Sequence, residues 1–167
     1  VETEENRQQK PNIIYIFADD LGYGELGTYG QKKIRTPNLD RLSAQGMRFT
    51  QHYTGAPVCA PSRYMFLTGN HAGHAYIRGN YELGQFSDEM EGGQMPIPES
   101  TPTLAKMLKK AGYQTAMVGK WGLGMNATTG SPLLQGFDYY YGYLDQKQAH
   151  NYYPTHLWEN DEKAPLN

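Results

Sequence analysis

Two residues four positions apart, Cys59 and Arg63, form the most reactive pairing in the sequence. Cys59 is the only cysteine, and Pro61 follows it where a helix would begin, because proline favours the first helical turn. Gly69 marks the expected end of that helix. The sequence therefore predicts Cys59 at or just before a helix N-terminus, where backbone N–H groups and the helix dipole favour negative charge. Arg63 would lie one turn further along the same face, so the pair suits a nucleophile that acts on an anion.

Asp19 and Asp20 are a second group with chemical potential, because they follow the apolar, β-branched run Asn12–Ala18. Such a run predicts a buried parallel strand, and open α/β sheets bind ligands at the carboxyl ends of their strands. Two adjacent carboxylates repel each other there, and a divalent cation would relieve the repulsion. The alternative is a pair of solvated acids in a turn.

Lys120 is the third candidate. A short buried strand predicted at 114–118 would deliver Lys120, within the glycine-rich stretch 119–124, to the same sheet edge as Asp19. Spacing alone leaves the ordinary alternatives open, since most free cysteines are small buried hydrophobic residues and most lysines lie on the surface.

The elements that would position these residues alternate between strand and helix. Helices are predicted at 37–45, 59–68 and 103–111, and strands at 12–18, 47–53 and 114–118. This alternation indicates an α/β fold, in which helices cover a parallel sheet. Residues 1–10 are predicted to form a disordered lead-in, and 71–93 a long loop.

The composition limits the classes of partner. The net charge is −2 and neither sign forms a long run, which indicates neither a nucleic acid nor an anionic membrane as partner. No stretch reaches about 18 consecutive apolar residues, so the sequence predicts no transmembrane helix. A single cysteine excludes an internal disulfide framework, and 167 residues suffice for one domain with a real core.

The segment Cys59-Ala-Pro-Ser-Arg63, followed by Leu-Thr-Gly69, resembles the signature of the type I sulfatases of the alkaline-phosphatase superfamily. The resemblance runs in order from about Pro11 to Trp158, and it is similar in particular to bacterial arylsulfatases and to galactose- and N-acetylgalactosamine-type carbohydrate sulfatases. It also takes in the segments Asp19-Asp20, Gly119-Lys-Trp-Gly-Leu-Gly124 and Gly136-Phe-Asp138.

This resemblance implies a three-layer α/β sandwich with a mostly parallel central sheet flanked by helices. Residues 11–167 would be the N-terminal part of the catalytic domain, truncated before its second half. The implied activity is hydrolysis of sulfate monoesters, either O-sulfated carbohydrates or aryl sulfates. The alternatives are a phosphoester or phosphonate hydrolase of the same superfamily and an inactive sugar-binding fragment. The isolated chain is expected to be inactive, because the later part of family members supplies further metal ligands.

The resemblance also implies a role for each site residue. A formylglycine-generating maturation enzyme would convert Cys59 to formylglycine, whose hydrate is both the nucleophile and a metal ligand. Asp19 and Asp20 would complete this part of the site for one divalent cation, Ca²⁺ in preference to Mg²⁺, because hard cations take oxygen ligands. Arg63 would orient the hydrate and Lys120 would bind the sulfate. Such an enzyme would work in the periplasm or outside the cell, after removal of a signal peptide.

One departure from the family pattern is Gly122, because sulfatases commonly have histidine two residues after the lysine. A donor to the sulfate is therefore missing or comes from elsewhere. The candidate substitutes are three basic side chains: His150 first, then His74 and Arg78. Alternatively, the glycine makes room for a sugar ring that stacks on Tyr152 or Trp158.

Overall fold

The computed structural model describes residues 10–84 and 91–166. They fall into two compact units, the first ending at Gln51 and the second beginning at His52. The predicted lead-in, residues 1–10, lies outside the described residues except for Lys10. Within the described part of the chain, no helix is both long and apolar enough to cross a lipid bilayer.

Residues 10–51 of the first unit contain one α-helix and two short 3₁₀ helices. These are η1 (Tyr23–Glu25), η2 (Gly27–Tyr29) and α1 (Pro37–Gln45). The proline in the first turn of α1 confirms the start predicted from the sequence. Asp40 of α1 holds η2 in place, because its Oδ1 accepts a hydrogen bond from the N–H of Thr28 at 2.6 Å.

Two strands predicted at 12–18 and 47–53 do not form, so these predictions are wrong. The apolar side chains of the first segment are exposed, with Ile14 at 87% and Ile16 at 77%. No backbone ladder forms among residues 10–51. The physical reason is that a strand needs hydrogen bonds to a neighbour, whereas an apolar run indicates burial without specifying a partner.

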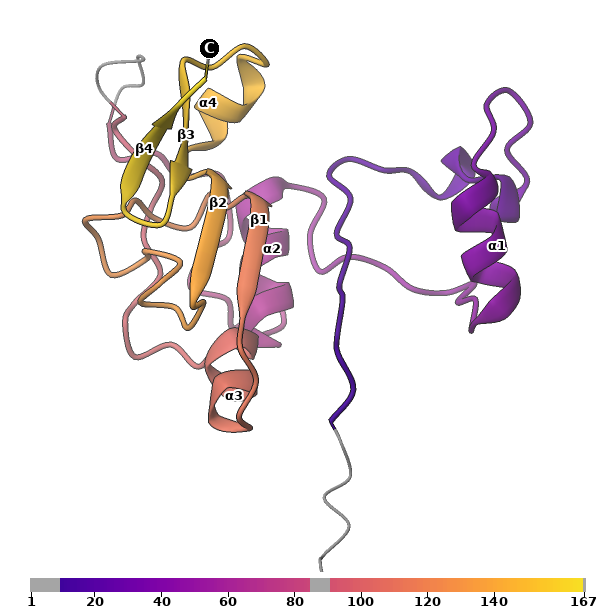
Figure 1. Ribbon diagram of the computed structural model, residues 1–167, viewed down its shortest axis with the longest axis horizontal. Helices are drawn as coiled ribbons and strands as arrows, with labels where there is room; N and C mark the ends of the chain where they lie inside the picture. Colours follow the sequence, from indigo (N-terminus) through magenta and orange to yellow (C-terminus); the bar gives the residue numbers. More distant parts are fainter. Residues whose placement is uncertain (1–9, 85–90, 167) are drawn as a thin grey trace, which may run out of the picture. The chain divides into compact units, whose positions relative to one another are not determined.

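The second unit is built on a four-stranded sheet in the order β1–β2–β3–β4 (Figure 1). The strands are β1 (Ala116–Lys120), β2 (Tyr139–Tyr143), β3 (His156–Glu159) and β4 (Glu162–Pro165). β1 and β2 pair in parallel, and the other two pairings are antiparallel. The described sheet is therefore mixed, whereas the sequence predicted a mostly parallel one. β1 itself begins two residues later than predicted.

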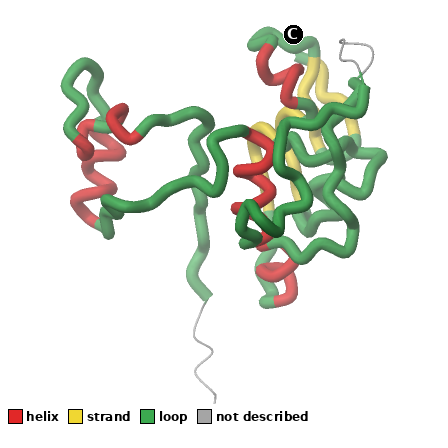
Figure 2. The backbone as a smooth tube through the Cα atoms, turned by 180° about the vertical axis from the view of Figure 1, so that it is seen from behind, coloured by secondary structure: helices red, strands yellow, loops and turns green. Residues whose placement is uncertain are grey.

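In the described part of this unit there are three α-helices: α2 (Cys59–Thr68), α3 (Leu104–Lys110) and α4 (Gln146–His150). α2 lies along one face of the sheet, behind β1 in Figure 1 and in front of the strands in Figure 2. It ends as predicted at Gly69, whose φ of 68° lets its N–H reach the carbonyl of Met65 at 2.8 Å. The bounds of α2 and α3 confirm the helices predicted there.

The core joins α2 to β2 and to the segment that follows β1. Trp121, Leu123 and Tyr140 are 0% exposed, and Tyr64 of α2 packs in the same cluster. Burying one large apolar side chain contributes about 1.5–3 kcal/mol. The indole N–H of Trp121 also donates to the carbonyl of Gly130 at 2.7 Å, so its polar atom is satisfied. This packing holds the end of β1 firmly beside α2.

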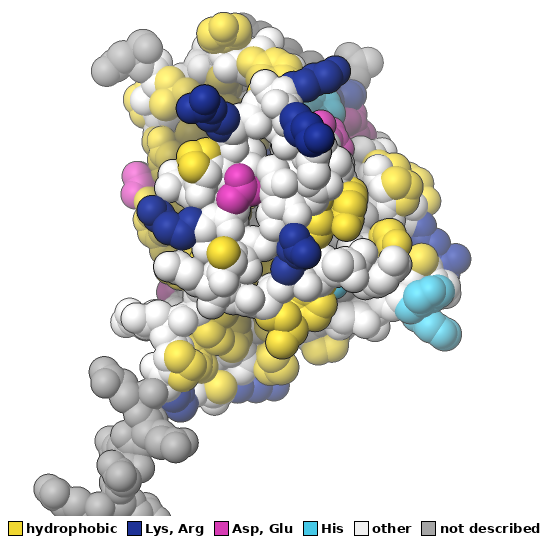
Figure 3. Space-filling model, turned by 90° about the vertical axis from the view of Figure 1, so that its right-hand side faces the viewer, with side chains coloured by type: hydrophobic (Ala, Val, Ile, Leu, Met, Phe, Trp, Pro, Cys, Tyr) yellow, Lys and Arg dark blue, Asp and Glu magenta, His cyan; other side chains and the backbone are white. Residues whose placement is uncertain are grey.

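One face of the molecule shows how charged side chains are distributed there (Figure 3). On the face shown in Figure 3, Lys and Arg lie scattered among neutral and hydrophobic side chains. A nucleic acid or an anionic membrane would favour a contiguous basic patch, and this face does not offer one.

Candidate active site

Cys59 is the first residue of α2, in the position that the sequence predicted. The preceding N-cap residue is Val58, whose side chain accepts no hydrogen bond, so the N–H groups of the first turn need another acceptor. The N–H of Ala60 finds one in Oδ1 of Asn80, at 2.9 Å. Asn80, in the loop after the helix, therefore caps α2 from a distance. The Cys59 thiol is half-buried and forms no disulfide.

Lys120 and Arg63 lie beside Cys59, and all three belong to the second unit. Lys120 ends β1, and its Nζ is 3.3 Å from Sγ of Cys59. Arg63 lies one turn into α2, is 8% exposed, and donates from Nη1 to the backbone carbonyl of Lys120. The structure thus brings together three residues that the sequence singled out separately. Their chemical roles stay predictions.

Asp19 and Asp20 belong to the first unit, and both are exposed. Neither ends a strand, because residues 12–18 form none. Asp20 has a positive φ of 55°, a left-handed conformation that Asp and Asn tolerate better than most residues. The two adjacent carboxylates are hard oxygen donors of the kind that Ca²⁺ and Mg²⁺ prefer. That they share a cation with residue 59 stays a prediction.

The space beside Gly122 is filled by another side chain. Gly122 is buried with a φ of 74°, and a Cβ there would lie 2.7 Å from Cγ and 2.8 Å from Nε2 of Gln146. These distances are shorter than real side chains allow, so Gln146 stands where a side chain at 122 would begin. No sequence pattern identifies Gln146, because its importance depends on a contact between residues far apart in the chain.

The three basic residues predicted to supply the missing donor lie on α4 and in the loop that follows α2. His150 is the last residue of α4 and is exposed, as is His74. Arg78 donates hydrogen bonds to the backbone carbonyls of Ala75 and Gly73, each at 2.9 Å, and so braces its own loop. A contact between these residues and a substrate stays a prediction.

Trp158 belongs to a buried polar cluster around Glu91. Oε2 of Glu91 accepts from the indole N–H of Trp158 at 2.8 Å, and its Oε1 lies 2.5 Å from Nε2 of His156. Trp158 is 7% exposed, whereas Tyr152 is 79% exposed. Of the two aromatic residues considered for stacking on a sugar, Tyr152 is therefore the one that a ligand can reach.

α4, which carries Gln146, begins at a buried aspartate. Asp145 is 1% exposed, and its Oδ1 accepts from the N–H groups of Lys147 at 2.6 Å and Gln148 at 3.4 Å. Burial raises the pKa of the Asp145 carboxyl, and the two backbone hydrogen bonds offset part of that effect.

We expect Asp145→Asn to keep the cap and to remove a pH-dependent loss of stability. A raised pKa means that the folded state binds the proton more tightly, so this carboxyl destabilises the wild type as pH rises through its folded pKa. Asparagine caps as well as aspartate, whereas Asp145→Ala should cost about 0.5–2 kcal/mol. Denaturant unfolding from about pH 4 to pH 7 measures the effect. Parallel pH dependences in wild type and Asp145→Asn would contradict it.

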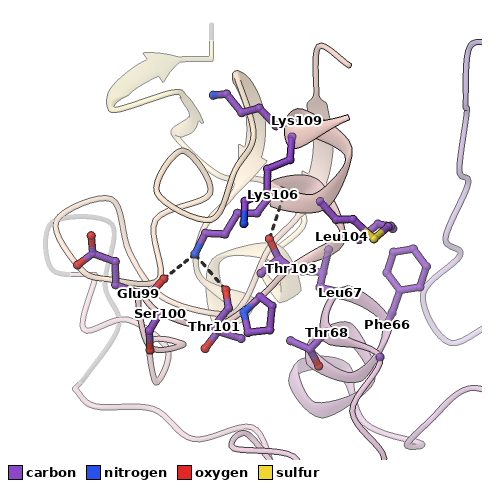
Figure 4. A pocket seen from close by; sticks show the side chains of 14 residues that line it. Phe66, Leu67, Thr68, Glu99, Ser100, Thr101, Thr103, Leu104, Lys106 and Lys109 are labelled. Carbon is purple, nitrogen blue, oxygen red and sulfur yellow. Dashed lines mark hydrogen bonds between the residues drawn. The ribbon is translucent and has the colours of Figure 1, made fainter. Parts of the chain in front are cut away.

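A groove of about 970 Å³ lies at the other end of α2 (Figure 4). Phe66 and Leu67 of α2 and Leu104 of α3 contribute its apolar wall. Lys106 crosses it, donating to the carbonyls of Glu99 at 2.6 Å and Thr101 at 3.1 Å. The lining does not include Cys59, Arg63 or Lys120, so the groove is separate from the candidate active site.

Comparison with known families decides which chemistry these residues belong to. Residues 11–164 match the family model described as Sulfatase. The chain belongs to the sulfatase family. This sulfatase chain is 43% identical to the steryl-sulfatase of Homo sapiens, over 84% of this chain and 25% of that protein. It is 41% identical to the N-acetylgalactosamine-6-sulfatase of Homo sapiens, over 80% of this chain and 26% of that protein.

The fold comparison agrees with the family. A solved structure from work on the metabolism of multiple glycosaminoglycans by Bacteroides thetaiotaomicron superposes with a TM-score of 0.77 at 36% identity. The match covers 95% of this chain and 33% of that chain. The α/β fold expected of a sulfatase is therefore confirmed. The chain spans about a quarter of the length of the curated sulfatases that it matches.

Proposed function

We propose that the protein containing this chain hydrolyses sulfate monoesters, with sulfated carbohydrates as its substrates. The observation that carries the proposal is the approach of Lys120 Nζ to within 3.3 Å of Cys59 Sγ, in a chain that belongs to the sulfatase family. Carbohydrate is favoured over sterol because one relative is named for N-acetylgalactosamine and the solved structure comes from glycosaminoglycan metabolism. A periplasmic or extracellular location remains part of the same proposal.

The proposed roles follow from the charges and contacts of the second unit. The Lys120 ammonium, beside residue 59, would bind a sulfate oxygen and stabilise the negative charge that grows in the transition state. Arg63 is buried and anchored to the Lys120 carbonyl, so its guanidinium is held in place to orient the side chain at 59. Conversion of Cys59 to formylglycine would supply a hydrated aldehyde, an oxygen nucleophile, in place of the thiol.

We further propose that Asp19 and Asp20 hold one divalent cation, Ca²⁺ in preference to Mg²⁺. The support is their chemistry: two adjacent, exposed carboxylates, one of them fixed in a left-handed backbone conformation. A cation held there would supply Lewis-acid stabilisation of the sulfate oxygens. Because the chain spans about a quarter of its curated relatives, we expect the isolated chain to be inactive.

Lys120→Met should lower kcat/KM for a sulfate ester by about 100- to 1,000-fold, the cost of removing one charge-stabilising donor. Methionine keeps most of the length of the lysine side chain, so the packing at the end of β1 should survive. Lys147→Met, which removes an exposed lysine that pairs with Glu82, is the matched control. Steady-state kinetics measure both variants. A Lys120→Met enzyme within about threefold of wild type would exclude a role for this ammonium.

The proposed function is tested with the complete protein, produced together with a formylglycine-generating enzyme. Its rates on 4-nitrophenyl sulfate, 4-nitrophenyl phosphate and a sulfated N-acetylgalactosamine are compared, and mass spectrometry of the peptide containing residue 59 reports the modification. We expect the sulfate ester to react at least about 100-fold faster than the phosphate ester. The opposite preference would assign the protein to phosphoester hydrolysis. Modified protein without any turnover would reject the proposal.

A further inference from the structure

Two buried glutamines, Gln94 and Gln146, and the exposed Asn80 form a chain of amide contacts that ends beside Cys59. Nε2 of Gln146 donates to Oε1 of Gln94 at 2.9 Å and lies 3.3 Å from Oδ1 of Asn80. The same Asn80 oxygen accepts the N–H of Ala60 at 2.9 Å. Gln94 is 1% exposed and Gln146 is 2% exposed. Gln146 is therefore linked, through Asn80, to the first turn of the helix that begins with Cys59.

The backbone fixes the direction of each hydrogen bond in this chain. The N–H of Ala60 can only donate, so the Asn80 atom that faces it must be the oxygen. The Gln146 atom that faces this oxygen must then be the donor, Nε2. The Gln94 atom on the other side of Nε2 must be an oxygen in turn. Flipping any one of the three amides would place two donors or two acceptors against each other.

Gln146 is the central member of this chain. Its Oε1 and the Nε2 of Gln94 are buried and form no hydrogen bond within the described residues, so both polar contacts of Gln146 depend on its Nε2. The same side chain packs against Gly122, two residues after Lys120. One glutamine thus contacts the backbone that follows Lys120 and holds the residue that caps the Cys59 helix.

We propose that Gln146 is a positioning residue of the active site: it holds Asn80 against the first turn of α2 and so fixes residue 59 relative to Lys120. Val58 cannot cap this helix with its own side chain, so without Asn80 the first turn loses the acceptor for the Ala60 N–H. The expected effect of Gln146 on catalysis rests on the proposed sulfatase function. The contacts among Gln146, Asn80 and Ala60 do not depend on that function.

Gln146→Glu is the sharpest test, because glutamate keeps the size of glutamine but turns acceptors toward the oxygens of Asn80 and Gln94. We expect kcat on 4-nitrophenyl sulfate to fall by about 10- to 100-fold in the complete protein, the cost of a small misplacement of reacting groups. KM should stay within about twofold, because the proposed role is to position residue 59 and not to bind the substrate. Gln146→Met is neutral but cannot donate a hydrogen bond. Its kcat should therefore lie between that of the wild type and that of Gln146→Glu.

Gln148→Glu is the matched control. Gln148 lies on the same short helix, is 0% exposed, and donates to the carbonyl of His156 at 2.9 Å, away from Asn80. At a temperature where circular dichroism shows both variants folded, we expect the kcat of Gln148→Glu within about twofold of wild type. Equal losses of kcat in the two glutamate variants would overturn the proposal, because they would reflect general loosening. A rise in KM alone for Gln146→Glu would also overturn it.

A stability cycle tests the contact chain without any assay of activity. Thermal unfolding is measured for Asn80→Ala, Gln146→Met and the double variant, and the double variant should lose less stability than the two single losses added together. Additive losses would overturn the proposal, even for a fully active enzyme. Non-additive losses in a protein that hydrolyses no sulfate ester would reject the proposed function and still support the link between Gln146 and Asn80.

Discussion

Cys59→Ala is expected to abolish turnover of sulfate esters and to leave the fold in place. The substitution removes the nucleophile, or the residue from which it is made, and loss of a nucleophile typically costs at least about 10⁴-fold in rate. The fold should tolerate the change because Cys59 is half-buried at the first position of α2 and alanine is a good helix former. Rates are measured on the complete protein, with unfolding followed by circular dichroism.

Two comparisons sharpen the result for Cys59. Cys59→Ser should also be inactive, unless the maturation enzyme of the host accepts serine. The free energy of unfolding of Cys59→Ala should lie within about 1 kcal/mol of wild type, since few packing contacts are lost. If Cys59→Ala failed to fold, the cysteine would be a structural residue, and its assignment as the source of the nucleophile would be wrong.

Asp20→Asn should remove most of the bound divalent metal and most of the activity, without unfolding the first unit. Asparagine tolerates the φ of 55° at this position about as well as aspartate, so the backbone conformation should persist. It lacks the negative charge that strengthens the binding of a hard cation, and losing a Lewis acid worth several kcal/mol corresponds to a loss of at least about 100-fold in rate. Elemental analysis and kinetics with and without a chelator measure the two effects.

Glu25→Gln is the matched control for Asp20→Asn, because it neutralises another exposed carboxylate of the same unit and still accepts the hydrogen bond from Gly22. We expect it to retain metal and activity. Full activity of Asp20→Asn in the presence of a chelator would show that the metal assignment is wrong.

Start and stop signals in the local sequence explain which elements could be predicted. Pro61 and Gly69 are local signals for the start and end of α2. The structure places Pro61 in the first turn and Gly69 just after the last turn, as predicted. The run at 12–18 failed because a strand depends on a partner that local sequence does not specify. β2 was missed for a related reason: its run of tyrosines and a glycine, 139–143, becomes a strand by pairing with β1.

The site divides in the same way. Cys59 and Arg63 were found from their spacing on one helix, and Lys120 from the strand predicted at 114–118, which ends just before it. Gln146 was not found, because the short chain of contacts that links it to Asn80 and Gly122 exists only after the fold has formed. Residues that act through tertiary contacts between polar side chains leave little trace in a single sequence.

The distant cap on α2 has a consequence for the order of folding. The helix has its own C-terminal stop at Gly69, but the acceptor for the N–H of Ala60 comes from Asn80, later in the chain. Contacts that close a loop pay entropy before they stabilise anything, and short helices nucleate poorly in isolation. The first turn of α2 is therefore expected to become ordered after the rest of the helix. On this expectation, residue 59 stays accessible on the folding chain for longer than the rest of the helix does.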